Sequence, residues 1–296
     1  MSSPAVLATF RAQPVVTSVL DMLAFSDFVS FSQLSPFTRR IAKRRFRERL
    51  VKLVGSFLCN GEGGFIEWQA AFTNLMSLAK ETDSVLMGSA ILQLLTLRGE
   101  EELRRLRNLN ILIPFSTVLQ WRRLFQQQLG FRLVGDEAVP EFLSQSCSSC
   151  LKFSKGTSFV LCTVARPANM LRALVAARAT SQMNIITGNC VLSFYPSLTV
   201  RRLSLLGWPA QAMGATTYEA MTGRQPPLGD VVRYGDGSEW SEPCGRECRR
   251  LMRLSTGYKG VGKFFWTDDS DSSIAYESES VLWFLAMTCV NPTCPE

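Results

Sequence analysis

The chain has 296 residues, of which 46% are hydrophobic and 19% charged, with 32 Lys and Arg against 25 Asp and Glu, no His and nine Cys. This composition favours a folded protein over a disordered one. The lack of His excludes Ser-His-Asp triads, Cys-His dyads and His-ligated metals. The net charge of +7 equals the excess of basic over acidic residues between positions 39 and 52, so the protein is nearly neutral apart from one basic segment.

The first 130 residues predict a helical region. Residues 15–25 form a short amphipathic stretch, and a long helical pattern starts at Ser35-Pro36 and continues to Phe57. Further helices are expected over 65–80, from Thr82 or Asp83 to Gly99, over 100–107, and from Pro114 or Ser116 to Gly130.

The pattern changes after Gly130, where short β-branched and aromatic runs predict strands. These runs are Phe131–Val134, Ser158–Val164, Asn189–Tyr195 and Lys263–Trp266. Helices are expected after Pro167 and over 197–206, loops over 222–262, and either a strand or a helix over 281–290. The expected fold class is α+β, with a helical half (1–130) followed by a mixed α/β, partner-binding half (131–296).

The apolar runs do not predict a membrane protein. The longest, Val85–Leu97 and Val281–Val290, are shorter than the roughly 17–25 residues that span a bilayer. Arg11 interrupts the first apolar stretch, so no signal peptide is expected. We therefore expect reduced thiols and a cytoplasmic or nuclear location.

The basic segment runs from Thr38 to Lys52 and reads TRRIAKRRFRERLVK. On a helix, steps of three and four residues bring Arg40, Lys43, Arg44 and Arg47 to one face. Arg39 directly precedes this group in the sequence. Such a stripe could neutralise several phosphates without base specificity, or act as a nuclear-import signal. The alternative is a solvated helix face that aids solubility.

The stretch just upstream, residues 15–41, reads VVTSVLDMLAFSDFVSFSQLSPFTRRI. It resembles the F-box, a short three-helix module that docks to the linker subunit of cullin ubiquitin ligases. The matching positions are Val15 and Val16, Val19 and Leu23, Asp27 and Phe28, Leu34 and Ser35, and Phe37. The chain departs from the family pattern where Arg11-Ala12 replaces Leu-Pro and where no closing Trp follows.

The resemblance implies a docking face that contacts the linker subunit. Its residues would be Val19, Leu23, Asp27, Phe28, Leu34 and Phe37. Asp27 also follows an apolar helix and is expected to cap the next one. The alternative is a helical hairpin that belongs to the core of the domain.

Four other patterns in the sequence resemble known binding motifs. Leu143, Cys147 and Leu151 match the loose motif by which some adaptors bind elongin C, if they share a helix face; a loop is the alternative. Residues 257–263 fit G-x-x-x-x-G-K, but the Phe that follows favours a glycine-rich hairpin over a P-loop.

The remaining two patterns concern metal ligands. Three cysteine pairs could hold zinc, although buried or loop thiols are the simpler interpretation: Cys147/Cys150, Cys244/Cys248 and Cys289/Cys294. The acids between Asp268 and Glu279 are typical of a solvated loop, which could also pair with the basic helix.

These patterns favour a non-enzymatic interaction protein without a cofactor. The most concrete version is an F-box-like adaptor that joins a ubiquitin ligase to an unknown target, as a viral accessory protein would. The alternative is a nucleic-acid-binding protein, nucleocapsid-like or a suppressor of RNA silencing, that uses Arg39, Arg40, Lys43, Arg44 and Arg47.

Overall fold

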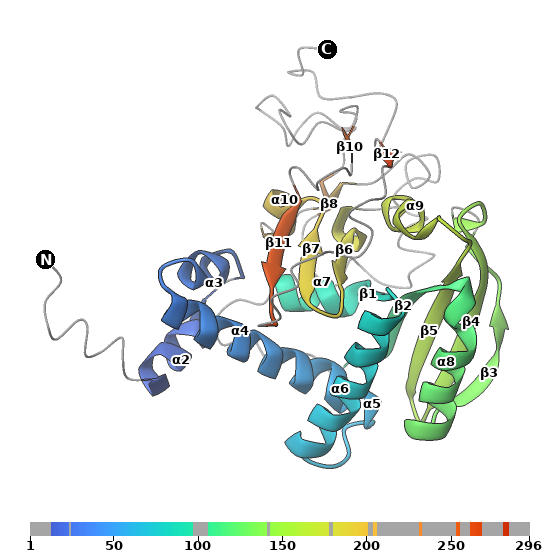
Figure 1. Ribbon diagram of the computed structural model, residues 1–296, viewed down its shortest axis with the longest axis horizontal. Coiled ribbons are helices and arrows are strands. Elements are labelled where there is room, and N and C mark those ends of the chain that lie inside the picture. The colour runs from blue at the N-terminus through green and yellow to red at the C-terminus, as the bar shows by residue number, and fades with distance from the viewer. Residues whose placement is uncertain are drawn as a thin grey trace, which may run out of the picture.

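The computed structural model describes residues 13–23, 25–96, 106–140, 143–177, 180–200, 261–267 and 281–283, and the pairs 204–205, 231–232 and 253–254. The fold is α+β, with helices in the N-terminal half and a mixed sheet with further helices in the C-terminal half (Figure 1).

The helices are mostly short; α2 to α6 precede the first strand, and the others alternate with strands along the chain. The longest are α4 (Pro36–Leu50) and α6 (Phe65–Glu81). The others are α2 (Gln13–Met22), α3 (Phe25–Ser32), η1 (Val51–Gly55), α5 (Ser56–Leu58), α7 (Ser89–Thr96), η2 (Phe115–Thr117), α8 (Val118–Arg123), η3 (Leu124–Gln128), α9 (Met170–Val175), η5 (Thr180–Gln182) and α10 (Pro196–Val200). Within the described ranges, none of them has the length and apolarity needed to cross a bilayer.

One sheet of eight strands organises the molecule. Its order is β11 (Gly262–Phe265), β7 (Cys190–Ser193), β6 (Asn184–Ile186), β1 (Val85–Met87), β2 (Asn108–Pro114), β5 (Ser158–Ala165), β4 (Cys147–Lys155) and β3 (Arg132–Glu137). Only β2 and β5 are parallel; the other neighbours are antiparallel. Two small pairs complete the described strands: β8 (Ser204–Leu205) with β9 (Val231–Val232), and β10 (Arg253–Leu254) with β12 (Leu282–Trp283).

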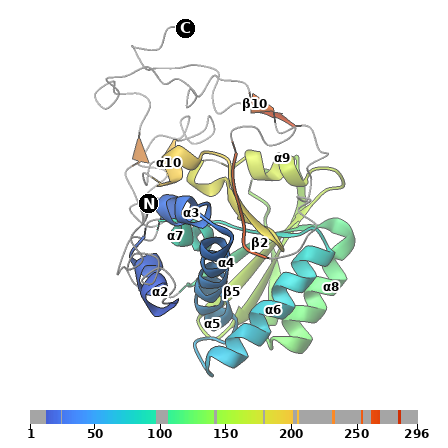
Figure 2. The same cartoon turned by 60° about the vertical axis from the view of Figure 1, so that its left-hand side comes forward.

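The middle of the sheet is buried on both faces, since most residues of β1, β2, β6 and β7 are buried, whereas the edge strand β3 is mostly exposed. Side chains alternate between the two faces along each strand. In β2, Leu109, Ile111 and Ile113 join the core beneath the N-terminal helices, whereas Leu112 joins a second core that includes α9. In Figure 2, α4, α6 and α8 lie side by side on the first face, and α9 lies above them, at about the height of α10.

The helix expected from Thr82 or Asp83 to Gly99 is wrong in its first part. Val85–Met87 is instead the strand β1, and Gly88, with φ of 86°, separates it from α7. Only glycine fits easily here, since an added Cβ would lie 2.6 Å from Asn110 Nδ2. A run that is apolar on every side does not distinguish a helix from a central strand, so pairing with β2 and β6 decides.

Most other expected elements are confirmed. The helical pattern from Pro36 to Phe57 is α4, η1 and α5, and the four expected strands correspond to β3, β5, β7 and β11. Strands β2, β4 and β6 were not expected. The helix expected over 197–206 is wrong in its second part, because α10 ends at Val200 and Ser204–Leu205 is the strand β8. Because β1 and β2 lie in the middle of the sheet, the sheet spans the expected boundary near residue 130. The expected helix over 100–107 lies mostly outside the described residues.

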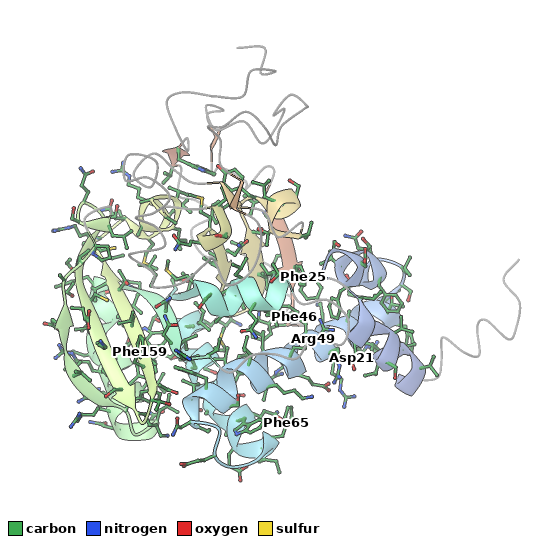
Figure 3. The ribbon with its side chains drawn as sticks, turned by 180° about the vertical axis from the view of Figure 1, so that it is seen from behind. Asp21, Phe25, Phe46, Arg49, Phe65 and Phe159 are labelled. Carbon is green, nitrogen blue, oxygen red and sulfur yellow. The ribbon has the colours of Figure 1, made fainter. Side chains whose placement is uncertain are left out.

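Four aromatic rings connect the N-terminal helices to the edge strand β11. The ring of Phe264 lies 5.9 Å from Phe25, 5.8 Å from Phe28 and 5.2 Å from Phe46, measured between ring centroids. All three contacts have the tilted or edge-on geometry that aromatic pairs prefer. We call Phe25, Phe28, Phe46 and Phe264 the aromatic cluster; Phe25 and Phe46 are labelled in Figure 3.

Truncation of the aromatic cluster should destabilise the whole fold. Phe46→Ala removes a fully buried ring and is expected to lower the free energy of unfolding by about 3–5 kcal/mol. Phe37→Ala, on the same helix but 41% exposed, should cost less than about 1 kcal/mol. Urea unfolding followed by circular dichroism measures both, and equal midpoints for the two variants would contradict this role of the cluster.

Candidate functional site

Hydrogen bonds between Ser35 and Thr38 define where the basic helix α4 begins. Ser35 has an extended backbone, its Oγ accepts from Thr38 N at 3.1 Å, and its own N donates to Thr38 Oγ1 at 3.0 Å. Pro36 occupies the first helical position, where its missing N–H has no cost. This capping box fixes the phase of the helix and therefore which basic side chains face the solvent.

The first turn of α4 contains no acid, and Arg39 and Arg40 lie close to it. Cations near a helix N-terminus oppose the helix dipole and typically cost a few tenths of a kcal/mol or more.

The basic residues of α4 fall into two groups. The outward group is exposed, and neither Arg39, Arg40 nor Arg47 forms an ion pair within the described ranges. Arg44 is also outward, 70% exposed, and its Nε lies 3.3 Å from Glu48 Oε1. Lys43 is half-buried, and its Nζ donates to Thr267 O at 2.6 Å.

The inward group connects α4 to α2 through Asp21. Arg45 contacts this carboxylate with two nitrogens, Nε to Oδ1 at 2.6 Å and Nη2 to Oδ2 at 2.5 Å. Arg49 is buried, donates to Leu20 O at 2.8 Å, and lies 3.9 Å from Asp21 Oδ1. Its guanidinium also stands 5.3 Å from the centroid of the Phe28 ring (Figure 3 labels Asp21 and Arg49).

These contacts affect the two guanidinium groups in opposite directions. The hydrogen bond to Asp21 raises the pKa of Arg45, and burial lowers the pKa of Arg49. Both side chains stay charged at physiological pH, because a guanidinium group is not deprotonated in proteins. The inward group is therefore structural, and only the outward group is available to a ligand.

The residues of the F-box-like stretch divide in a similar way. Phe28 is fully buried in the aromatic cluster, and Leu23 is half-buried against the same core. Three of the expected apolar docking residues are exposed: Val19 at 39%, Leu34 at 70% and Phe37 at 41%. Asp27 is exposed but does not cap α3, which begins two residues earlier at Phe25, so the expected N-cap is wrong.

Sequence reasoning did not identify Asp21 or Arg49 as important residues. Asp21 and Arg45 are 24 positions apart, so no local pattern reveals that they meet. Arg49 is one of eight cations between positions 39 and 52, and composition alone does not show which of them is buried.

The structure contradicts two of the other candidate motifs, and most of the rest lie outside the described residues. Leu143, Cys147 and Leu151 do not share a helix face, because β4 begins at Cys147. Gly262 and Lys263 lie in β11, so no helix follows the G-x-x-x-x-G-K pattern. The acids over 268–279 and the pairs Cys244/Cys248 and Cys289/Cys294 lie outside the described residues.

Cys147 and Cys150 are buried neighbours on β4. Burial, followed by the nearby Cys150, raises the pKa of the Cys147 thiol to about 11, and burial also raises the pKa of Cys150. No cluster of three or more Cys, Asp or Glu in the described residues could hold a metal ion.

No protein-family model, curated protein or solved structure matches this chain. The candidate site is therefore defined by its own geometry: an exposed apolar tip at Leu34 and Phe37, continued along α4 by the outward cations.

The thiols of β4 should resist alkylation in the folded protein. At pH 8 Cys147 is almost entirely protonated and buried, so iodoacetamide should modify it far more slowly than in urea, where its pKa returns to about 8.5. The partly exposed Cys59 is an internal comparison that should react first. Peptide mass mapping over time measures both rates; rapid native modification of Cys147 would contradict its burial.

Proposed function

We propose that this chain is a non-enzymatic interaction protein of the cytoplasm or nucleus that docks a protein partner through its N-terminal helices. The most concrete version is an F-box-like adaptor that contacts the linker subunit of a cullin ubiquitin ligase and presents a target, in the manner of a viral accessory protein. The exposure of Leu34 and Phe37, two large apolar side chains at the tip of a capped helix, is the observation that carries the proposal.

The burial of Phe28 limits the form that docking can take. A ring packed against Phe46 and Phe264 is not available to a partner without unfolding the cluster. The contact would therefore use the outer rim, with Val19 on α2 and Leu34 and Phe37 at the start of α4. Rigid apolar anchors on a small surface are the usual source of binding energy at such contacts.

A pull-down tests the adaptor proposal with variants that leave the core intact. Purified linker subunit should capture the wild type, and Leu34→Ala/Phe37→Ala should reduce the affinity at least tenfold, because each anchor is expected to contribute about 1 kcal/mol or more. Phe115→Ala/Leu119→Ala removes an equally exposed apolar pair at the start of α8 and should bind like the wild type. Failure of the folded wild type to bind the subunit would refute the proposal.

A second candidate function is the binding of nucleic acid along α4. It is favoured by the exposure of Arg39, Arg40 and Arg47, for which the described part of the chain supplies no counter-ion. Guanidinium groups on one helix face can contact successive phosphates, which would give affinity without sequence preference.

Fluorescence anisotropy with a labelled RNA or DNA duplex tests this second candidate. Affinity should fall steeply between 50 and 200 mM salt, and Arg39→Gln/Arg40→Gln/Arg47→Gln should weaken binding and reduce the salt slope by about three. The matched control neutralises three exposed arginines elsewhere, Arg107, Arg123 and Arg132, with the same loss of charge. An equal effect of both triple variants would indicate attraction by net charge alone and would argue against a site on α4.

A further inference from the structure

Two adjoining cavities lie along the seam between α3 and β11. The first has a volume of about 260 Å³, and its walls come from α3, α7, β7, α10 and β11. The second has a volume of about 340 Å³ and lies between α3, the start of α4 and β11. Val29, Lys263 and Phe264 line both cavities, so the two lie next to each other along the seam.

The first cavity offers an almost entirely apolar surface. Phe25, Val29, Leu95 and Val191 form much of it. The hydroxyl groups near one end are engaged with protein atoms: Ser193 Oγ donates to Thr199 Oγ1 at 3.2 Å, and Thr199 Oγ1 donates to Asn184 Oδ1 at 3.2 Å. Because these hydroxyls are directed toward one another, the cavity suits a hydrocarbon better than a sugar or a base.

A close backbone approach shapes this apolar cavity. A Cβ at Gly262 would lie 2.9 Å from Pro196 Cβ, so glycine lets the start of α10 pack directly against β11. Pro196 and Val200 of α10 thereby supply one wall, at the edge of the sheet.

The second cavity is polar and basic. Arg39, Lys43 and Lys263 line it together with Ser32 and Gln33, and none of its described lining residues is acidic. Lys43 Nζ already donates to Thr267 O, so Arg39 is the cation that can hold an anionic group here, and a guanidinium binds a carboxylate with two hydrogen bonds.

We propose that the two cavities together form one binding site for a linear amphiphile, an unbranched alkyl chain ending in an anionic head group. The chain would occupy the apolar cavity past Val29 and Phe264, and the head group would lie beside Arg39 in the basic cavity. The combined volume falls within the range of roughly 300–1,000 Å³ that is typical of small-molecule sites. This site is separate from the exposed tip at Leu34 and Phe37, so it does not depend on the proposed docking function.

Calorimetric titration of the full chain with decanoate tests the proposal, with decyl phosphate and decanol as parallel probes. Decanoate or decyl phosphate should bind at one site, and whichever binds more tightly identifies the head group as a carboxylate or a phosphate. Decanol has the same chain without the charge and should bind at least tenfold more weakly. Absence of binding by both anions, or equal binding of decanol, would overturn the proposal.

Variants assign the binding to the two cavities. Arg39→Gln should weaken decanoate binding about tenfold, whereas Arg47→Gln, which removes the same charge from the same helix outside both cavities, should have no effect. Ser26→Trp places a large side chain at a half-buried position in the wall of the apolar cavity and should abolish binding. Equal affinities of the Arg39 and Arg47 variants would show adsorption by net charge and would refute the site.

Discussion

The aromatic cluster is the contact on which the rest of the structure depends. It joins Phe25 and Phe28 of α3, Phe46 of α4 and Phe264 of β11, elements that are more than 200 residues apart at the extremes. Without it, α3 would have no fixed position against the sheet, and the cavities between α3 and β11 would lose their shared wall. Arg49 ties α2 to the same cluster, because its guanidinium packs against the ring of Phe28 and its Nη2 donates to Leu20 O near the end of α2.

The division of the basic segment into two groups follows from the phase of one helix. The Ser35 cap fixes where α4 starts, and steps of three and four residues then direct Ile41, Ala42, Phe46, Arg49 and Leu50 inward. Arg45 lies beside this inward face, where Asp21 is available to it. The net charge of +7 therefore overstates the charge that a polyanion would meet, since Arg45 is paired with Asp21 and the buried Arg49 donates to a backbone carbonyl.

Much of the fold could be predicted from periodicity and caps, and the two central strands that were missed, β1 and β2, share one cause. The pattern of α6 and the alternation in β5 were readable because each element has one face in a core and one face outside it. β1 and β2 were not, since a strand in the centre of a sheet is covered on both faces and loses its alternation. The candidate site could be predicted in part. The exposure of Arg39 and Arg40 follows from the phase of α4. The burial of Phe28 depends on Phe264 of β11, and no local pattern reveals a contact between residues so far apart in the sequence.

The geometry of α4 also implies that the two proposed partners would compete. Phe37 and Arg40 are three residues apart, so they are neighbours on the helix surface. A protein that covers the ring of Phe37 would also cover the guanidinium of Arg40, and a duplex lying along Arg40 and Arg47 would block access to the apolar tip. Docking and nucleic-acid binding can therefore be alternative states of one surface, but a single copy of the chain cannot do both through α4 at once.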